Sequence, residues 1–402
     1  MEKADVVIVG SGIAGLAAAF TLCEESSLAV VLVEERAVGA NRTTPIVFPD
    51  TLDAFGLGES IQQNYSRYEF HSPLGATASF DYKRDALTSI DYRKACASLY
   101  ERAAGNGLQL RKARALDWSP SNPDPRLPLV VHLDNGDSIQ TQVLIDASGH
   151  AQWAAKRLNI RLSPYYSVCY GEFLTGCSVK EHSSFWFLAP HSRYGSGGGW
   201  FYPLGESSVS MGYAILVKEP HHSAEDAAEG YRTAKREFQP FADWVKDGFV
   251  QRVECGVIPV GRIGRFVDNR ILIVGDAAGQ ATPWCMMGVN QCLSNGLLSA
   301  KVTLKAFANR RFDRAMLSLY ERNWAKGNRE SFWRALCFIE SMWMRQTDED
   351  WDKLVSSCRR VSAEKKLQEM RYNQVPFYQR AYAVVGYLRR QLTRRIGNPI
   401  GG

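Results

Sequence analysis

The sequence predicts an α/β protein with three parts: a Rossmann-like dinucleotide-binding domain, an inserted α+β domain built on a β-sheet, and a C-terminal helical region. Three observations predict this fold class. A glycine-rich strand–helix–strand pattern opens the chain, alternating apolar and polar residues such as SSVSMGYAIL (207–216) fill its middle, and helical spacing dominates after residue 305. The length of 402 residues and the 45% hydrophobic content fit a globular protein of two or three domains.

The N-terminal element is a β-branched run that leads into Gly10-x-Gly12-x-x-Gly15, an alanine-rich helical stretch and a second apolar strand that ends at Glu34. Gly10 permits a tight turn, Gly12 lets the backbone approach a pyrophosphate, and Gly15 lets the helix pack closely on the strand. Glu34 is placed to accept hydrogen bonds from a ribose diol. This arrangement predicts a dinucleotide-binding site, and its position at the start of the chain favours FAD.

A second element of the same site lies far along the chain, in RILIVGDAAG (270–279). Its apolar run predicts a buried strand that ends at Asp276, followed by a helix that starts near residue 288. In an FAD protein, a carboxylate at that position can form hydrogen bonds in the ribityl or pyrophosphate region of the cofactor. The start of the following helix can face the pyrimidine edge of the flavin.

These elements set the expected domain boundaries. The FAD-binding domain is expected to be discontinuous and to consist of residues 1–50, 85–160 and 260–305. The sheet domain that covers the flavin is expected to consist of residues 51–84 and 161–259, and the C-terminal helical region of residues 306–402.

Three further segments carry a resemblance to a known group of proteins. They are VLIDASGHAQWAAKRL (143–158), IDYRKACASLYERAAGNGLQLRKARAL (90–116) and GGWFYPLGESSVSMGYA (198–214). Together with the two cofactor elements, they resemble flavoproteins of the para-hydroxybenzoate hydroxylase fold. Within that fold the resemblance is closest to the geranylgeranyl reductase branch, which is related to lycopene cyclases and flavin-dependent halogenases.

The third segment resembles a motif of the reductase branch, Tyr-x-Trp-x-Phe-Pro followed by a spacer and Gly-x-Gly/Ala. Trp200 matches the tryptophan, Tyr202 replaces the phenylalanine, and Gly198 stands where tyrosine is expected. Trp200, Tyr202 and Cys285 are the candidate catalytic residues, and Tyr202 and Cys285 are the candidate proton donors. A small buried hydrophobic residue is the alternative interpretation of Cys285.

The resemblance also implies a set of cofactor-binding residues. The set is Gly10, Gly12, Ile13, Ala14, Gly15, Glu34, Glu35, Arg36, Arg42, Arg93, Ala115, Gly275, Asp276, Pro283, Met287, Gly288 and Val289. Arg93 is a displaced candidate, because the arginine of the family would fall at Asp91. Met286 and Met287 replace adjacent glycines of the family, so their thioether side chains are expected to reshape the flavin face. AVGANRTTPIV (37–47) stands in place of a Cys-Gly-Gly element that some reductases of the family have.

The activity that the resemblance implies is reduction of a double bond in an apolar, isoprenoid-like or secondary-metabolite substrate by hydride transfer from reduced flavin. The reductant is expected to be external, NAD(P)H or another donor, because the glycine-rich YGSGGGW (194–200) enters no alanine-rich helix and so forms no second fingerprint. The alternatives are a monooxygenase or halogenase on the same fold, a lycopene-cyclase-like enzyme without net redox change, and a non-catalytic flavin-binding protein.

Cysteine usage and charge suggest where the protein works. Nine cysteines without a Cys-x-x-Cys pair argue against a disulfide framework and a metal site, and favour the cytoplasm. The net charge of +6 is concentrated after residue 300, where 21 Lys and Arg face 10 Asp and Glu. A basic amphipathic helix over 381–396 is expected either to contact a membrane surface or to pack on the protein body, and nucleic acid is not an expected partner.

A stripe of large apolar residues lies at helical spacing within 329–344. It consists of Phe332, Trp333, Leu336, Ile339, Met342 and Trp343. Two interpretations remain open: the stripe lines a tunnel for a long apolar substrate, or it packs a helix on the protein body.

Overall fold

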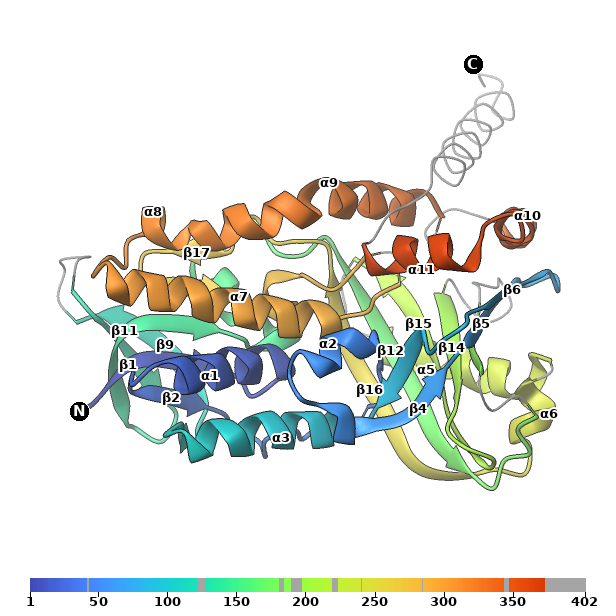
Figure 1. The fold of residues 1–402 in the computed structure, drawn as a ribbon, viewed down its shortest axis with the longest axis horizontal. Coiled ribbons are helices and arrows are strands. Elements are labelled where there is room, and N and C mark those ends of the chain that lie inside the picture. Colours follow the sequence, from blue (N-terminus) through green and yellow to red (C-terminus); the bar gives the residue numbers. More distant parts are fainter. Residues whose placement is uncertain are drawn as a thin grey trace, which may run out of the picture.

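The computed structural model describes residues 1–41, 43–121, 127–180, 184–188, 197–218, 223–239, 241–283, 285–342 and 347–372. Two large sheets, one small sheet and several helices make up this part of the chain (Figure 1).

The first large sheet contains the predicted Rossmann-like unit. Along its main path lie β17 (Val267–Asp268), β18 (Ile271–Ile273), β11 (Ser138–Asp146), β1 (Glu2–Val9), β2 (Val30–Val33) and β8 (Gln109–Arg111), with β9 (Ala115–Pro120) and β10 (Leu129–Leu133) attached through β11. β1 pairs in parallel with β11 and β2, and β11 pairs in parallel with β18. The fold class predicted from the sequence, a Rossmann-like parallel sheet with an added β-sheet domain and C-terminal helices, is confirmed.

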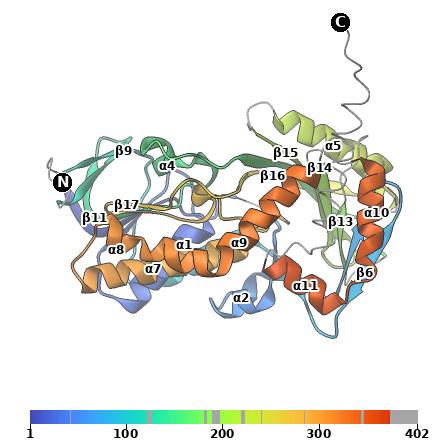
Figure 2. The same cartoon turned by 90° about the horizontal axis from the view of Figure 1, so that it is seen from above.

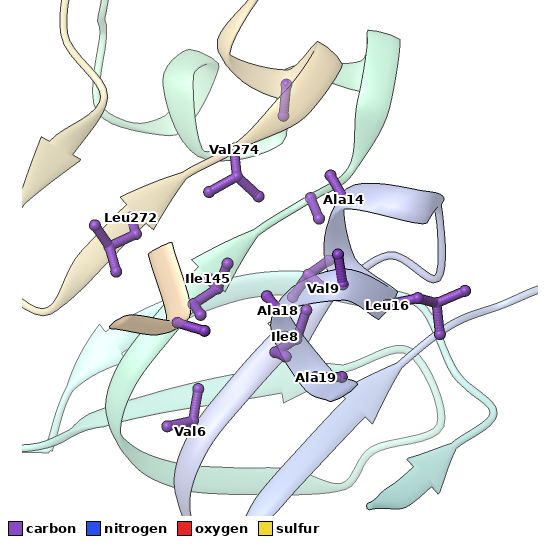
Figure 3. Packing of buried hydrophobic residues seen from close by; sticks show 14 of the residues in the cluster. Val6, Ile8, Val9, Ala14, Leu16, Ala18, Ala19, Ile145, Leu272 and Val274 are labelled. Carbon is purple, nitrogen blue, oxygen red and sulfur yellow. The ribbon is translucent and has the colours of Figure 1, made fainter. Parts of the chain in front are cut away.

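Three helices pack on one side of this sheet: α1 (Ile13–Glu25), α3 (Tyr92–Gly105) and α7 (Val289–Ala308). The alanine-rich sequence of α1 is explained by its neighbours. A Cβ at Gly296 of α7 would lie 2.4 Å from the carbonyl oxygen of Ala14, so the two helices touch backbone to backbone. Figure 3 shows the core beneath them, where Ile8 of β1 lies near Ala18 of α1.

The second large sheet forms the other half of the molecule. Its strands, in order, are β16 (Phe249–Val260), β12 (Tyr165–Thr175), β15 (Ser208–Val217), β14 (Gly197–Pro203), β13 (Ser184–Leu188), β5 (Arg67–His71) and β6 (Thr77–Asp81). The pairings are antiparallel except that of β13 with β5. The alternating pattern predicted for residues 207–216 is confirmed as β15. Helices α5 (Ser223–Glu237) and α6 (Phe241–Val245) cover one face with a cluster rich in aromatic residues, so the other face is left for the site.

A small sheet lies between the two halves. It consists of β3 (Ile46–Val47), β7 (Leu87–Ile90) and β4 (Ile61–Tyr65), and α2 (Pro49–Asp53) follows β3. β4 precedes the domain boundary expected at residue 85 and β7 follows it. Since the two strands pair, the small sheet crosses that expected boundary.

The described residues after α7 form α8 (Arg314–Leu317), α9 (Leu319–Met342), α10 (Asp348–Cys358) and α11 (Ala363–Arg371). α9 runs from the first sheet toward the second (Figure 2). Phe332 and Ile339 are buried, whereas Trp333 is 66% exposed, so the predicted stripe packs this helix on the body. Trp343 and the basic segment 381–396 lie outside the described residues. Among the described helices, none is long and apolar enough to cross a membrane.

Candidate cofactor and substrate site

A cavity of about 650 Å³ lies where the carboxyl ends of the parallel strands face the second sheet. Val9, Val33, Ala147 and Val274, which end or follow β1, β2, β11 and β18, form its floor. Ligands of open parallel sheets bind at this edge. Most of the predicted site residues line the cavity: Gly10, Gly12, Ile13, Ala14, Glu34, Glu35, Arg36, Ala115, Trp200, Tyr202, Asp276, Cys285, Met287, Gly288 and Val289.

Three predicted residues lie behind the wall of the cavity. A Cβ at Gly15 would lie 2.2 Å from the Gly10 carbonyl oxygen, which supports the packing role predicted for this glycine. Gly275 adopts a positive φ of 63°, and a Cβ there would lie 2.7 Å from the Cβ of Ala14. Pro283 is buried beside the turn that carries Cys285. All three shape the backbone around the cavity.

The glycine loop after β1 has the shape that a dinucleotide requires. Gly10 has a φ of 101°, and a Cβ there would lie 2.4 Å from the Ala147 carbonyl oxygen. A Cβ at Gly12 would meet only the Tyr92 hydroxyl, at 3.7 Å, so the backbone at Gly12 is open to the cavity. Glu34 accepts hydrogen bonds at Oε2 from the backbone N–H and the hydroxyl of Ser11, at 2.9 and 2.7 Å. Its carboxylate is therefore held at the rim of the cavity by the loop itself.

Asp276 is a buried carboxyl group at the cavity wall. It lies in a short 3₁₀ turn, Gly275–Ala278, directly after β18. Among the described residues its side chain receives one weak hydrogen bond, from Cys292 Sγ at 3.9 Å. Burial raises the pKa of Asp276 from its ordinary value to about 6. A carboxyl group in this state is stabilised by hydroxyl groups that a ligand brings into the cavity, so the residues present fit a polyhydroxylated cofactor.

Tyr92 was missed by the sequence analysis, which considered an arginine here. Asp91 caps α3 by accepting a hydrogen bond from Lys94 N at 3.1 Å, so the helix begins at Tyr92. The Tyr92 hydroxyl accepts a hydrogen bond from Ile13 N at 3.0 Å, at the start of α1. Burial holds the pKa of Tyr92 well above its usual range, so the phenol is neutral.

The position of Arg93 needs correction, because this residue is exposed and does not line the cavity. Because α3 begins directly after the Asp91 cap, Arg93 lies on the side of the helix that faces solvent. Arg42, another predicted cofactor-binding arginine, lies outside the described residues. Arg36 does line the cavity.

The Trp200 motif is explained by strand pairing. In the β14–β15 pair, Trp200 lies opposite Gly212, Tyr202 opposite Ser210, and Gly198 opposite Ala214. A Cβ at Gly212 would lie 2.1 Å from the Trp200 ring. The glycine of the motif therefore makes room for the indole, which lies flat across the neighbouring strand.

A buried carboxylate that the sequence analysis missed connects this tryptophan to the other side of the cavity. Glu254 of β16 lines the cavity, and its side chain is 3% exposed. It accepts hydrogen bonds from Ser210 Oγ at 2.8 Å, from Thr44 Oγ1 at 2.8 Å and from Arg252 Nη2 at 2.8 Å. Ser210 Oγ in turn accepts from Trp200 Nε1 at 3.2 Å. The network fixes the indole and ties loop 37–47 to the second sheet.

The two candidate proton donors are both neutral. Burial holds the pKa of Tyr202 well above its usual range, and burial also raises the pKa of the Cys285 thiol. Cys285 Sγ lies 3.3 Å from Thr282 Oγ1. Each side chain therefore carries a proton at neutral pH, and neither is an ionised nucleophile.

Of the two methionines that replace glycines, Met286 has a glycine-like backbone. Met286 has a φ of 56°, in the left-handed region that favours glycine. The turn is held by Met286 N, which donates to the Thr282 carbonyl oxygen at 2.8 Å, and by Met287 N, which donates to Thr282 Oγ1 at 3.1 Å. Both side chains line the cavity. This turn therefore presents two methionine side chains to the cavity.

Comparison with known proteins supports the flavoprotein interpretation. A family model described as "Lycopene cyclase protein" matches residues 5–185. Digeranylgeranylglycerophospholipid reductase 1 of Methanococcoides burtonii is 24% identical over 388 residues, which cover 90% of each chain. A geranylgeranyl bacteriochlorophyll reductase-like protein of Thermoplasma acidophilum superposes with a TM-score of 0.79 at 18% identity, over 96% of each chain. The flavin-dependent brominase Bmp2 superposes with a TM-score of 0.73 at 14% identity, over 98% of this chain and 99% of its own.

Proposed function

We propose, from the premise that this chain has the fold of the geranylgeranyl reductase-like flavoproteins, that it is an FAD-dependent oxidoreductase which reduces a double bond of an apolar, isoprenoid-like substrate. The observation that carries this proposal is a single cavity lined by both the dinucleotide loop and the Trp200 motif. Reductase relatives extend along nine tenths of the chain, which supports redox chemistry.

The residues that would hold FAD are backbone and carboxyl groups at the cavity wall that a ligand can reach. The open backbone at Gly12 and the N-terminus of α1 suit the pyrophosphate. Glu34 suits the ribose of the adenosine, and Asp276 suits hydroxyl groups of the ribityl chain. When it is bound and reduced, FAD supplies a hydride to the substrate.

The chain itself would position the substrate and exclude water. Trp200 offers a flat apolar surface, held by Ser210 and Glu254. Tyr202 and Cys285 each hold a proton, at Oη and Sγ, that can be donated to carbon as the double bond is saturated. Since burial raises both pKa values, the transfer requires a strongly basic acceptor, such as a developing carbanion.

We also propose a reductant and a cellular location for the reaction. The reductant is NAD(P)H or another external donor, in keeping with the single fingerprint in the sequence. The protein works in the cytoplasm and contacts a membrane surface through its arginine-rich C-terminal segment, where its apolar substrate would be dissolved.

The test is anaerobic turnover of the purified protein with FAD, NADPH and an isoprenoid substrate. The proposal predicts bleaching of the flavin absorbance by the reductant, recovery on adding substrate, and a product that has gained two hydrogen atoms.

One alternative is favoured by the family model that matches residues 5–185: a lycopene-cyclase-like isomerisation. An isomeric product of unchanged mass, formed without consumption of reductant, would identify it. Turnover that requires oxygen would instead identify a monooxygenase or halogenase, in line with the brominase fold.

A further inference from the structure

We infer that Met286 and Met287 set the length of the apolar substrate that the cavity accepts, and that they restrict it to a short isoprenoid chain. The inference rests on the proposed function and specifies the substrate class of the same site. Both methionines line the cavity, and each also contacts an apolar cluster that continues beyond it.

Met286 closes the cavity toward the C-terminal helices. It packs against a cluster that includes Tyr165 and Val260 of the second sheet and Phe338 of α9. Its φ of 56° is a conformation that a glycine adopts without strain. A strained residue persists where the surroundings hold it and its side chain has a use. The use that the geometry offers here is to fill the space between the cavity and α9.

Met287 closes the cavity on another side. It packs against a cluster that includes Phe48 and Tyr65 beside the small sheet, together with Met370 of α11. Tyr202, a candidate proton donor, packs against the same cluster. The methionine therefore separates the reaction site from an apolar region beneath α11.

The methionines also limit the apolar space beside the cofactor. The cavity of about 650 Å³ is shared by the cofactor and the substrate. Shortening either methionine side chain would add apolar space, toward α9 at Met286 and toward α11 at Met287. Methionine side chains are flexible and fill irregular apolar gaps, so they can form this wall of the cavity.

The experiment compares the wild-type protein with Met286→Gly, Met287→Ala and the double variant. Geraniol, farnesol and geranylgeraniol, which contain two, three and four isoprene units, are titrated into each FAD-loaded protein. The dissociation constants are read from the perturbation of the flavin absorbance, and thermal unfolding with and without each alcohol gives a second measure. Neither measurement depends on turnover.

The wild type is expected to bind geraniol or farnesol more tightly than geranylgeraniol. Each single variant is expected to improve binding of the longest alcohol by about tenfold relative to geraniol, the effect of extending an apolar pocket by a few carbons. Met316→Ala is the matched control, because Met316 is buried in the core of the first sheet and does not line the cavity. Its length preference should equal that of the wild type.

Two outcomes overturn the inference. A wild type that binds all three alcohols equally, or methionine variants that keep the wild-type preference, would show that another wall sets the length. If the FAD-loaded wild type binds none of the alcohols, the proposed isoprenoid function fails as well. Glycine at 286 suits the observed φ, so that variant remains informative even if Met287→Ala does not fold.

Discussion

The network around Glu254 gives a prediction whose size follows from the structure. Glu254→Gln keeps the shape of the side chain but removes its charge. Arg252 loses two charge-assisted hydrogen bonds, from Nε at 3.1 Å and from Nη2 at 2.8 Å. The amide nitrogen also replaces one of the two carboxylate oxygens, so it faces either Ser210, which donates to Oε2, or Thr44 and Arg252, which donate to Oε1.

Hydrogen bonds to charged groups contribute about 1.5–3 kcal/mol each. Arg252 retains 26% exposure, so water replaces part of what it loses. We therefore expect the free energy of unfolding to fall by about 2–3 kcal/mol. Equilibrium unfolding in urea measures this directly.

Glu225→Gln is the matched control. Glu225 also pairs with an arginine, at 2.7 Å, but its side chain is 79% exposed. Water screens such a pair, and no measurable loss of stability is expected. If Glu254→Gln unfolded at the same urea concentration as this control, the carboxylate would not hold the two sides of the cavity together, and the reasoning would be refuted.

Three further predictions concern the cavity wall. Gly212→Ala should destabilise the protein by about 1–3 kcal/mol, because its Cβ would lie 2.1 Å from the Trp200 ring, and adding Trp200→Ala should abolish that extra cost in a double-mutant cycle. The folded pKa of Asp276, about 6, lies above its ordinary value, so its contribution to the stability of the FAD-free protein is present at about pH 4 and is lost as the pH rises through 6. Asp276→Asn should therefore stabilise the FAD-free protein at about pH 8, by up to roughly 3 kcal/mol in a thermal or urea titration. The same variant should bind FAD more weakly. A wild type and a variant of equal stability at about pH 4 and at about pH 8 would contradict the raised pKa of Asp276. Tyr92→Phe should weaken FAD binding by about fivefold in a fluorescence titration, because the hydroxyl that holds the start of α1 in place at Ile13 N is lost beside the cofactor, and unchanged affinity would remove Tyr92 from the site.

Local patterns in the sequence were sufficient to predict those parts of the site that are each formed by one short segment. The glycines after β1 and the acid after β2 fall at the cavity because a parallel sheet brings its carboxyl ends to one edge. Asp276 follows the same rule from a distant strand. Trp200 and Gly212 could be predicted as a motif, and the register of one hairpin explains their spacing.

Contacts between distant segments could not be predicted in this way. Glu254 acquires its role from Thr44, which is 210 residues away, and from Ser210 on a strand that is not its neighbour. No periodicity in the sequence encodes such a contact. Tyr92 lines the cavity and Arg93 does not, although the two are adjacent in α3. The Asp91 cap fixes where the helix begins and therefore which of the two faces the cavity.

The central claim is that one cavity binds one FAD through the loops at Gly12 and Asp276. The most direct measurement is the absorbance spectrum of the purified protein, followed by titration of the protein with FAD. The structure predicts flavin bands and saturation at one FAD per chain. A colourless protein that takes up no FAD at high concentration would contradict the claim.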